Sequence, residues 1–150
     1  MRSTILLLSE DKPGVLNRVT SLLRRKRFNI VGITAGPTLE PNMSRFAITI
    51  DDTEERTAKI IKQIERLIEV VEVVEVSQDK SIMSEMLLAK FKNSKNLFNH
   101  LPNCKQLVQS VDEIIVGFIG TPDEVDLFIE KSKPLGLLEI SRSGITTLPL

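Results

Sequence analysis

The sequence predicts an α+β fold built from two βαββαβ units. Over residues 1–77 the hydrophobic pattern gives, in order, a strand, a helix, two strands, a helix and a strand. The same order returns more loosely after a polar stretch at residues 78–84. A chain of 150 residues is long enough for two small domains, each with helices on one face of a sheet. We therefore expect a domain over residues 1–77, a linker over 78–84 and a smaller domain over 85–150.

The first half of the first unit contains clear strand and turn signals. A continuous apolar run predicts a strand over residues 4–9, and Asp11 is then the expected N-cap of a helix over 12–26. A second strand is expected over 29–38, where a Gly-Pro pair marks a turn. Clean alternation of apolar and polar residues predicts a third strand over 43–50.

The second helix of this unit is predicted from a capping signal and a repeating apolar face. Asp52, followed three residues later by Glu55, resembles a capping box and predicts the start of the helix. A run of β-branched residues then predicts a closing strand over 70–76. The apolar residues expected on the buried face of the helix are Ala58, Ile61, Ile64 and Ile68.

The second unit repeats this order with shorter elements. Thr121 with Glu124 three residues later, and Pro122 at the first helical position, predict the start of its last helix. Gly136 is expected to end that helical region. The expected elements are a strand over 85–91, a short helix over 95–101 ended by Pro102, strands over 104–111 and 113–119, a helix over 122–133 and a strand over 137–141.

Composition argues against several classes of partner and location. The 20 basic and 20 acidic residues give a formal net charge of zero, which argues against nucleic acid and an anionic membrane surface as partners. A single cysteine cannot form an internal disulfide and fits a reducing compartment. The apolar run at residues 5–8 is too short for the core of a signal peptide. We expect a soluble, cytoplasmic protein without a membrane segment.

The residue types that usually carry catalysis or bind metals are scarce. His100 and Cys104 are the only residues of their kinds, and Pro102 between them breaks a helix that would place both on one face. A zinc site needs three or four protein ligands, so neither residue has the partners it would require. The glycines form no phosphate-binding motif. The sequence therefore predicts no catalytic residue and no metal site.

The charged residues fall into surface patterns. Acidic side chains near the second helix and the strand after it, Glu69 and Glu72 among them, are predicted on solvated faces. The one basic cluster, residues 24–27, ends the first helix, where cations complement the helix dipole. A surface for an anionic partner is the weaker alternative for this cluster in a neutral chain. The absence of Trp and Tyr also argues against an RNA-recognition module, which stacks bases on aromatic residues.

Pro13 and Gly14 stand at the expected start of the first helix. Proline suits a first turn, but glycine costs about 1 kcal/mol relative to alanine inside a helix. One explanation is a small anionic ligand on the backbone amides of residues 13–16, which the missing Cβ leaves accessible. The other is close packing of the helix on a neighbouring strand. The residues alone leave both explanations open.

Several segments together resemble a known family. Residues 10–16, Glu-Asp-Lys-Pro-Gly-Val-Leu, are similar to the signature of ACT domains, which are ferredoxin-like βαββαβ modules that sense amino acids. Further segments, colinear over nearly the whole chain, resemble the regulatory small subunit of acetolactate synthase, also called acetohydroxyacid synthase. They are Phe-Asn-Ile at 28–30, Ala-Gly-Pro-Thr at 35–38, Pro-Asn-Met-Ser-Arg-Phe at 41–46, Glu-Met-Leu-Leu at 85–88, Gly-Thr at 120–121 and Glu-Ile-Ser-Arg-Ser-Gly at 139–144.

The resemblance implies a non-catalytic regulatory subunit. In this family the catalytic large subunit carries thiamine diphosphate, Mg²⁺ and FAD and condenses pyruvate. The small subunit holds no cofactor, raises that activity and confers feedback inhibition by a branched-chain amino acid, usually valine. The ACT modules pair through their sheets as a homodimer, and the effector binds at the pair interface. Carried over to this sequence, the effector contacts are Asp11, Gly14 and the backbone of Val15 and Leu16 from one chain, with Asn29 and Ile30 from the facing chain.

Two positions depart from the family pattern. Asp11 stands where the family usually has asparagine, and its carboxylate would attract the ammonium group of an amino acid and repel its carboxylate. Arg27 stands where the family commonly has glycine, and would be slightly strained in a left-handed conformation. The alternative function is a stand-alone ACT-domain amino-acid sensor that acts on a transcriptional or other protein partner. A ferredoxin-like enzyme is a further alternative, against which the missing catalytic groups argue.

Overall fold

The chain forms two four-stranded sheets, each with its own helices, and the expected α+β class is confirmed. The computed structural model describes residues 2–77, 79–101 and 103–150. Gln78, in the expected linker, and Pro102, the expected end of the short helix, lie outside the described residues. No helix in the described part of the chain is long and apolar enough to cross a membrane.

Contacts divide the chain into two compact units. The first comprises Met1–Ile82 together with Ile145–Leu150, and the second comprises Met83–Gly144. Residues 145–150, expected in the second domain, therefore group with the first unit. There the Thr34 hydroxyl donates to the Ile145 carbonyl at 2.7 Å, and the Leu150 amide donates to the Lys80 carbonyl at 3.0 Å.

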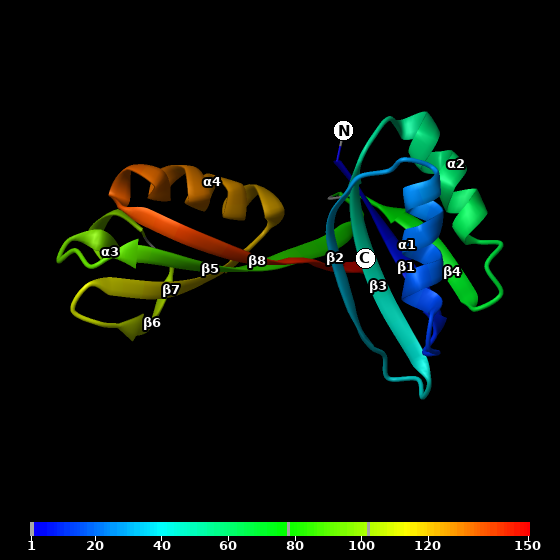
Figure 1. Ribbon diagram of the computed structural model, residues 1–150, viewed down its shortest axis with the longest axis horizontal. Helices are drawn as coiled ribbons and strands as arrows, with labels where there is room; N and C mark the ends of the chain where they lie inside the picture. The colour runs from blue at the N-terminus through cyan, green and yellow to red at the C-terminus, as the bar shows by residue number, and fades with distance from the viewer. Residues whose placement is uncertain (1, 78, 102) are drawn as a thin grey trace. The chain divides into compact units, whose positions relative to one another are not determined.

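The first sheet has the strand order β2-β3-β1-β4. Strands β1 and β3 pair antiparallel along their whole length, from Arg2 opposite Asp51 to Glu10 opposite Met43. Figure 1 shows helices α1 and α2 together on one face of this sheet. The elements of the unit are β1 (Arg2–Glu10), α1 (Val15–Arg25), β2 (Ile30–Pro37), β3 (Met43–Asp51), α2 (Glu54–Ile64) and β4 (Val70–Val76).

The core of the first unit lies between the sheet and its two helices. Alternate residues of β1 and β3 face the helices, as the period of a strand requires. Burial of these side chains supplies most of the stabilisation, at about 1.5–3 kcal/mol for each large aliphatic residue. The buried cluster is Ile5, Leu7, Val19, Leu22, Leu23, Phe46, Ile48, Ile50, Ile60, Ile64 and Val73.

Helix α2 begins one residue later than its sequence signal indicates. Thr53 rather than Asp52 is the N-cap, because the Arg56 amide donates to Thr53 Oγ1 at 3.4 Å while Asp52 accepts from the Thr53 amide at 2.8 Å. The helix ends at Ile64, so Ile68 lies beyond it and is 93% exposed. The buried residues of the helix are Thr57, Ile60 and Ile64. Of the four expected residues, Ile64 is confirmed and Ile61 is partly buried against the core, whereas Ala58 and Ile68 are exposed.

Helix α1 ends in a left-handed turn at Arg27, which has a φ of +59°. The Phe28 amide donates to the Leu23 carbonyl and the Arg27 amide to the Arg24 carbonyl, both at 3.0 Å. These two bonds form the Schellman arrangement, in which the left-handed position favours glycine. Phe28 packs against the core cluster that contains Leu23. Arg27 therefore carries the strain expected for a non-glycine residue at this position.

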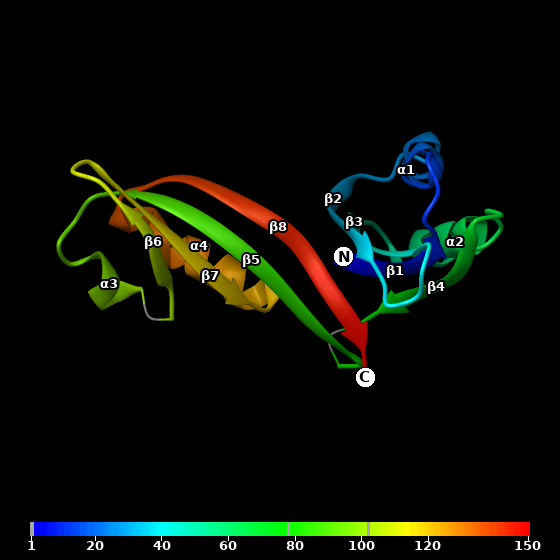
Figure 2. The same cartoon turned by 90° about the horizontal axis from the view of Figure 1, so that it is seen from below.

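The second sheet repeats the strand order of the first. Its order is β6-β7-β5-β8, which matches β2-β3-β1-β4 when the strands of each unit are counted along the chain. Figures 1 and 2 show α4 along one face of this sheet. The elements are β5 (Ser81–Lys92), α3 (Leu97–His100), β6 (Lys105–Gln109), β7 (Glu113–Gly120), α4 (Pro122–Ser132), a 3₁₀ turn (Lys133–Leu135) and β8 (Leu137–Pro149).

The expected start of α4 is confirmed. The Glu124 amide donates to Thr121 Oγ1 at 3.3 Å, and the Thr121 amide donates to Glu124 Oε2 at 2.7 Å, which completes a capping box. Gly136 ends the helical region with a φ of +85°. Strand β8 continues to Pro149, well beyond the expected end at residue 141. One reason is that the Met86 amide of β5 donates to the Ser143 hydroxyl at 3.0 Å.

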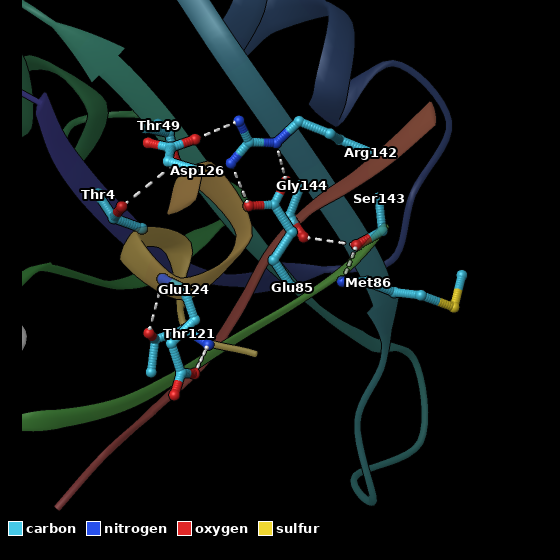
Figure 3. A network of polar contacts seen from close by, with 10 residues as sticks. All are labelled: Thr4, Thr49, Glu85, Met86, Thr121, Glu124, Asp126, Arg142, Ser143 and Gly144. Atoms are coloured by element: carbon cyan, nitrogen blue, oxygen red, sulfur yellow. Dashed lines mark hydrogen bonds and ion pairs between the residues drawn. The ribbon is translucent and has the colours of Figure 1, made fainter. Parts of the chain in front are cut away.

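Arg142 joins three elements of the second unit (Figure 3). Its Nε and Nη2 donate to the two carboxylate oxygens of Glu85 in β5, at 2.7 and 2.6 Å, and its Nη1 donates to Asp126 of α4 at 2.6 Å. Glu85 is 4% exposed, so this bidentate pair is largely shielded from water. Hydrogen bonding to Glu85 raises the pKa of Arg142 above its ordinary value. Sequence reasoning missed this cluster, because the two paired residues are 57 positions apart.

Candidate effector-binding loop

The loop between β1 and α1, residues 11–14, lies outside the helix. Gly14 is the N-cap of α1, so the expected N-cap Asp11 and the expected helix start at residue 12 are wrong. The Asp11 amide instead donates to the Asn42 carbonyl at 2.7 Å. The Lys12 carbonyl accepts from the Val15 amide at 3.3 Å, which closes a tight turn before the helix.

Gly14 has a backbone conformation that favours glycine. Its φ is +89°, in the left-handed region that costs other residues about 1–2 kcal/mol. A Cβ placed on Gly14 would meet no atom within 4 Å. Close packing on a strand, one of the two explanations for this glycine, is therefore wrong. The space in front of the residue is open, as the explanation by a bound ligand requires.

The N-terminal end of α1 carries no capping group. Among the described residues no side chain accepts from its first turn, and that turn contains no acidic residue. The amides of Leu16 and Asn17 have no acceptor within the described residues. Helices α2 and α4 differ, because each has a threonine cap and two acidic residues in its first turn. Within the described residues, no capping side chain or first-turn carboxylate therefore offsets the partial positive charge at the start of α1.

The residues predicted to bind an effector fall at two ends of the first sheet. The loop follows Glu10, where β1 pairs with Met43. Ile30 pairs with Ile50, which pairs in turn with Ser3 near the start of β1. Ser3 and Glu10 are seven residues apart, which is roughly 23 Å along a strand. One chain therefore does not bring Ile30 and its neighbour Asn29 to the loop.

Most of the predicted contacts are accessible in the single chain. Asp11, Gly14 and Asn29 are exposed, Leu16 is 41% exposed and Ile30 is half-buried. Val15 is buried, so only its backbone is available to a ligand, as the resemblance implies.

Two ion pairs flank the loop. Lys12 pairs with Glu10, and hydrogen bonding to this carboxylate raises the pKa of Lys12 above its ordinary value. Arg18, one turn into α1, pairs with Glu69. Glu69 is 8% exposed, so its expected place on a solvated face is wrong, whereas Glu72 is exposed as expected. No local pattern predicts the Arg18–Glu69 pair, because its partners are 51 positions apart.

Within the described part of the chain, no hydrogen bond joins His100 to Cys104. Cys104 donates its thiol to the Leu101 carbonyl at 3.2 Å, and partial burial raises the pKa of the thiol. His100 is the last residue of α3. Among the residues that the structure describes, no group of three or more His, Cys, Asp or Glu side chains is placed to hold a metal ion.

The two βαββαβ units define a protein of the ACT-domain class, with an open helix start beside a glycine turn in the first unit. Residues 5–72 match the family described as the AHAS small subunit-like ACT domain, where AHAS is acetohydroxyacid synthase. Residues 84–149 match the family described as the small subunit of acetolactate synthase. The chain belongs to the acetolactate synthase small-subunit family, as its sequence motifs indicated.

Similar proteins align along nearly the whole chain. The acetolactate synthase small subunit of Mycolicibacterium smegmatis is 32% identical over 155 residues, covering 97% of this chain and 89% of its own. That of Haemophilus influenzae is 33% identical over 155 residues, covering 99% and 95%. The crystal structure of the small subunit from Thermotoga maritima has a TM-score of 0.87 at 27% identity, covering 100% and 98% of the two chains.

Proposed function

We propose that this chain is the regulatory subunit of an acetolactate synthase. It raises the activity of a catalytic large subunit and confers feedback inhibition by a branched-chain amino acid, with valine as the first candidate. Membership of the small-subunit family along both units is the observation that carries this proposal. Thiamine diphosphate, Mg²⁺ and FAD belong to the catalytic partner in this scheme, and the regulatory chain acts without a cofactor.

The uncapped start of α1 supports a site for the carboxylate of an amino acid. The amides of Leu16 and Asn17 lack acceptors within the described residues, and the space over Gly14 is open. A carboxylate placed there would accept hydrogen bonds from these amides and interact favourably with the helix dipole. The Asp11 carboxylate, which forms no ion pair with a described residue, would pair with the ammonium group.

A homodimer formed through β2 would complete this site. Strand β2 lies at the edge of the first sheet, and Pro37 at its end pairs with Ser44, which pairs with Ser9 close to the loop. Antiparallel pairing of two β2 strands would place Ile30 of one chain beside Pro37 of the other. Asn29 and Ile30 would then reach the loop of the facing chain, across the roughly 23 Å that separates them within one chain.

Regulation in this scheme is a coupling between two sites. The effector shifts the activity of the catalytic subunit only by its difference in affinity for the two states of the assembly, typically about 1–3 kcal/mol. The chain itself would make no acetolactate from pyruvate.

Reconstitution tests the proposed function. The chain is mixed with the large subunit from the same genome, and acetolactate formation is measured with and without valine, leucine or isoleucine. We expect the chain to raise turnover and one of the amino acids to lower it. A chain that binds a branched-chain amino acid but leaves the large subunit unaffected would instead be a stand-alone sensor. A chain that converts pyruvate alone would contradict the regulatory role.

A further inference from the structure

Glu69 contacts residues on either side of the candidate effector-binding loop, residues 11–14. The residue lies between α2 and β4 and is 8% exposed. Its main-chain carbonyl accepts from the Glu10 amide at 2.9 Å, immediately before the loop. Its carboxylate accepts from the guanidinium of Arg18, four residues after Gly14. A single residue far away in the sequence therefore bridges the segment that leads into α1.

The loop has few side-chain restraints of its own. No side chain caps α1, and the Gly14 backbone has the wide conformational freedom of glycine. The Arg18 amide donates to the Gly14 carbonyl at 3.0 Å, so Glu69 holds the same residue that fixes the position of Gly14. Because the Glu69 side chain is only 10% exposed, water competes less for its carboxylate than in an exposed ion pair such as Lys59–Glu55.

We propose that Glu69 is a positioning residue for the effector site, acting through Arg18 to hold the first turn of α1. The orientation of the Leu16 and Asn17 amides then depends on a contact that the ligand itself does not touch. The choice of ligand rests on the proposed function, whereas the restraint on the loop does not.

The test compares Glu69→Gln with Glu72→Gln in the full-length chain. Glu69→Gln removes the charge and keeps the size of the side chain and the main-chain carbonyl that bonds to Glu10. Glu72→Gln makes the same charge change on the neighbouring strand β4, at an exposed residue that forms no ion pair with a described residue. Valine is the probe, and calorimetric titration is done at a temperature where circular dichroism shows each variant to be folded. We expect Glu69→Gln to raise the Kd for valine about three- to tenfold and Glu72→Gln less than twofold.

Amide hydrogen exchange on the ligand-free protein gives a second, independent readout. Glu69→Gln should speed exchange at the Val15 and Arg18 amides, which bond to the Lys12 and Gly14 carbonyls, and leave α2 unchanged. Unchanged exchange at these two amides would overturn the inference, and so would faster exchange with an unchanged Kd for valine. A parent chain that binds none of the branched-chain amino acids would overturn the proposed function, and the exchange rates would still decide whether Glu69 holds the loop.

Discussion

Substitution of Gly14 by aspartate separates the binding role of this residue from its structural role. The left-handed φ of +89° costs an aspartate about 1–2 kcal/mol, and the dipole at the start of α1 offsets about 0.3–1 kcal/mol of this. The new Cβ meets no atom within 4 Å, so no packing is lost. The net cost is therefore about 1 kcal/mol, or a fall in Tm of about 4–8 °C for a unit of this size.

The effect of this substitution on binding should be much larger than its effect on stability. The new carboxylate would occupy the place proposed for the carboxylate of the effector, so that steric exclusion and charge repulsion act together. A loss of several kcal/mol in binding free energy leaves no measurable binding at millimolar ligand. Calorimetric titration with valine and a melting curve on the same sample measure both quantities.

Gly14→Asn is the matched control, because asparagine has the same shape and the same backbone strain but no charge. Its Tm should lie a few degrees below that of Gly14→Asp, because the uncharged side chain lacks the dipole offset, and it should retain more affinity for valine. Normal binding by Gly14→Asp would refute the placement of the effector carboxylate over Gly14. Equal loss of binding in the two variants would mean that exclusion is steric and that charge has no part in it.

Three further predictions concern assembly and stability. Sedimentation at micromolar concentration should give a dimer, and a clean monomer of 16.8 kDa would contradict a site shared between two chains. Arg27→Gly should stabilise the protein by about 0.5 kcal/mol by relieving the left-handed strain, whereas Arg27→Ala, which keeps the strain, should not. Arg142→Met should destabilise the second unit by about 2–4 kcal/mol, because it leaves the buried Glu85 carboxylate without its cation. Unfolding is best followed by circular dichroism, because the chain has no Trp or Tyr, and a stable Arg142→Met variant would show that the cluster in Figure 3 contributes little.

The strand over residues 43–50 was predicted more closely than the start of α1, for a physical reason, whereas β5 begins at Ser81, inside the expected linker, and not at residue 85. Alternation over residues 43–50 is a local property of the pleat, and the observed strand is Met43–Asp51. The Asp11 amide donates to the Asn42 carbonyl, 31 positions away, and the turn before α1 is closed between Lys12 and Val15. The capping preference of aspartate therefore pointed to the wrong residue. The end of β8 was missed because residues 142–149 have no regular alternation of apolar and polar side chains, and the strand is held there by its neighbour β5.

The candidate site was predictable only where its residues are contiguous. The segment from Asp11 to Leu16 predicts an anion site as one of two explanations, because a glycine at a helix start is an unusual local signal. Glu69 looked like one of many surface carboxylates, and only the fold brings it to Arg18. Glu69 is buried by tertiary structure, and the pattern of residues within a single helix or strand does not predict that.

Strands β2 and β6 both lie at the edge of their sheet, but they differ in how readily a newly made chain could aggregate through them. Strand β6 has five residues, begins with Lys105 and is interrupted by a bulge between Gln106 and Val108, all of which discourage the addition of a further strand. Strand β2 is longer, with eight residues, and although it too has a bulge, between Ile30 and Gly32, it runs in unbroken register with β3 from Gly32 to Pro37. An uncovered β2 is thus the open template on which newly made chains would aggregate. Overproduction should therefore yield inclusion bodies when two chains do not pair rapidly through β2. Substitutions in β2 that oppose the addition of a further strand, such as a lysine or a proline, should increase the soluble yield.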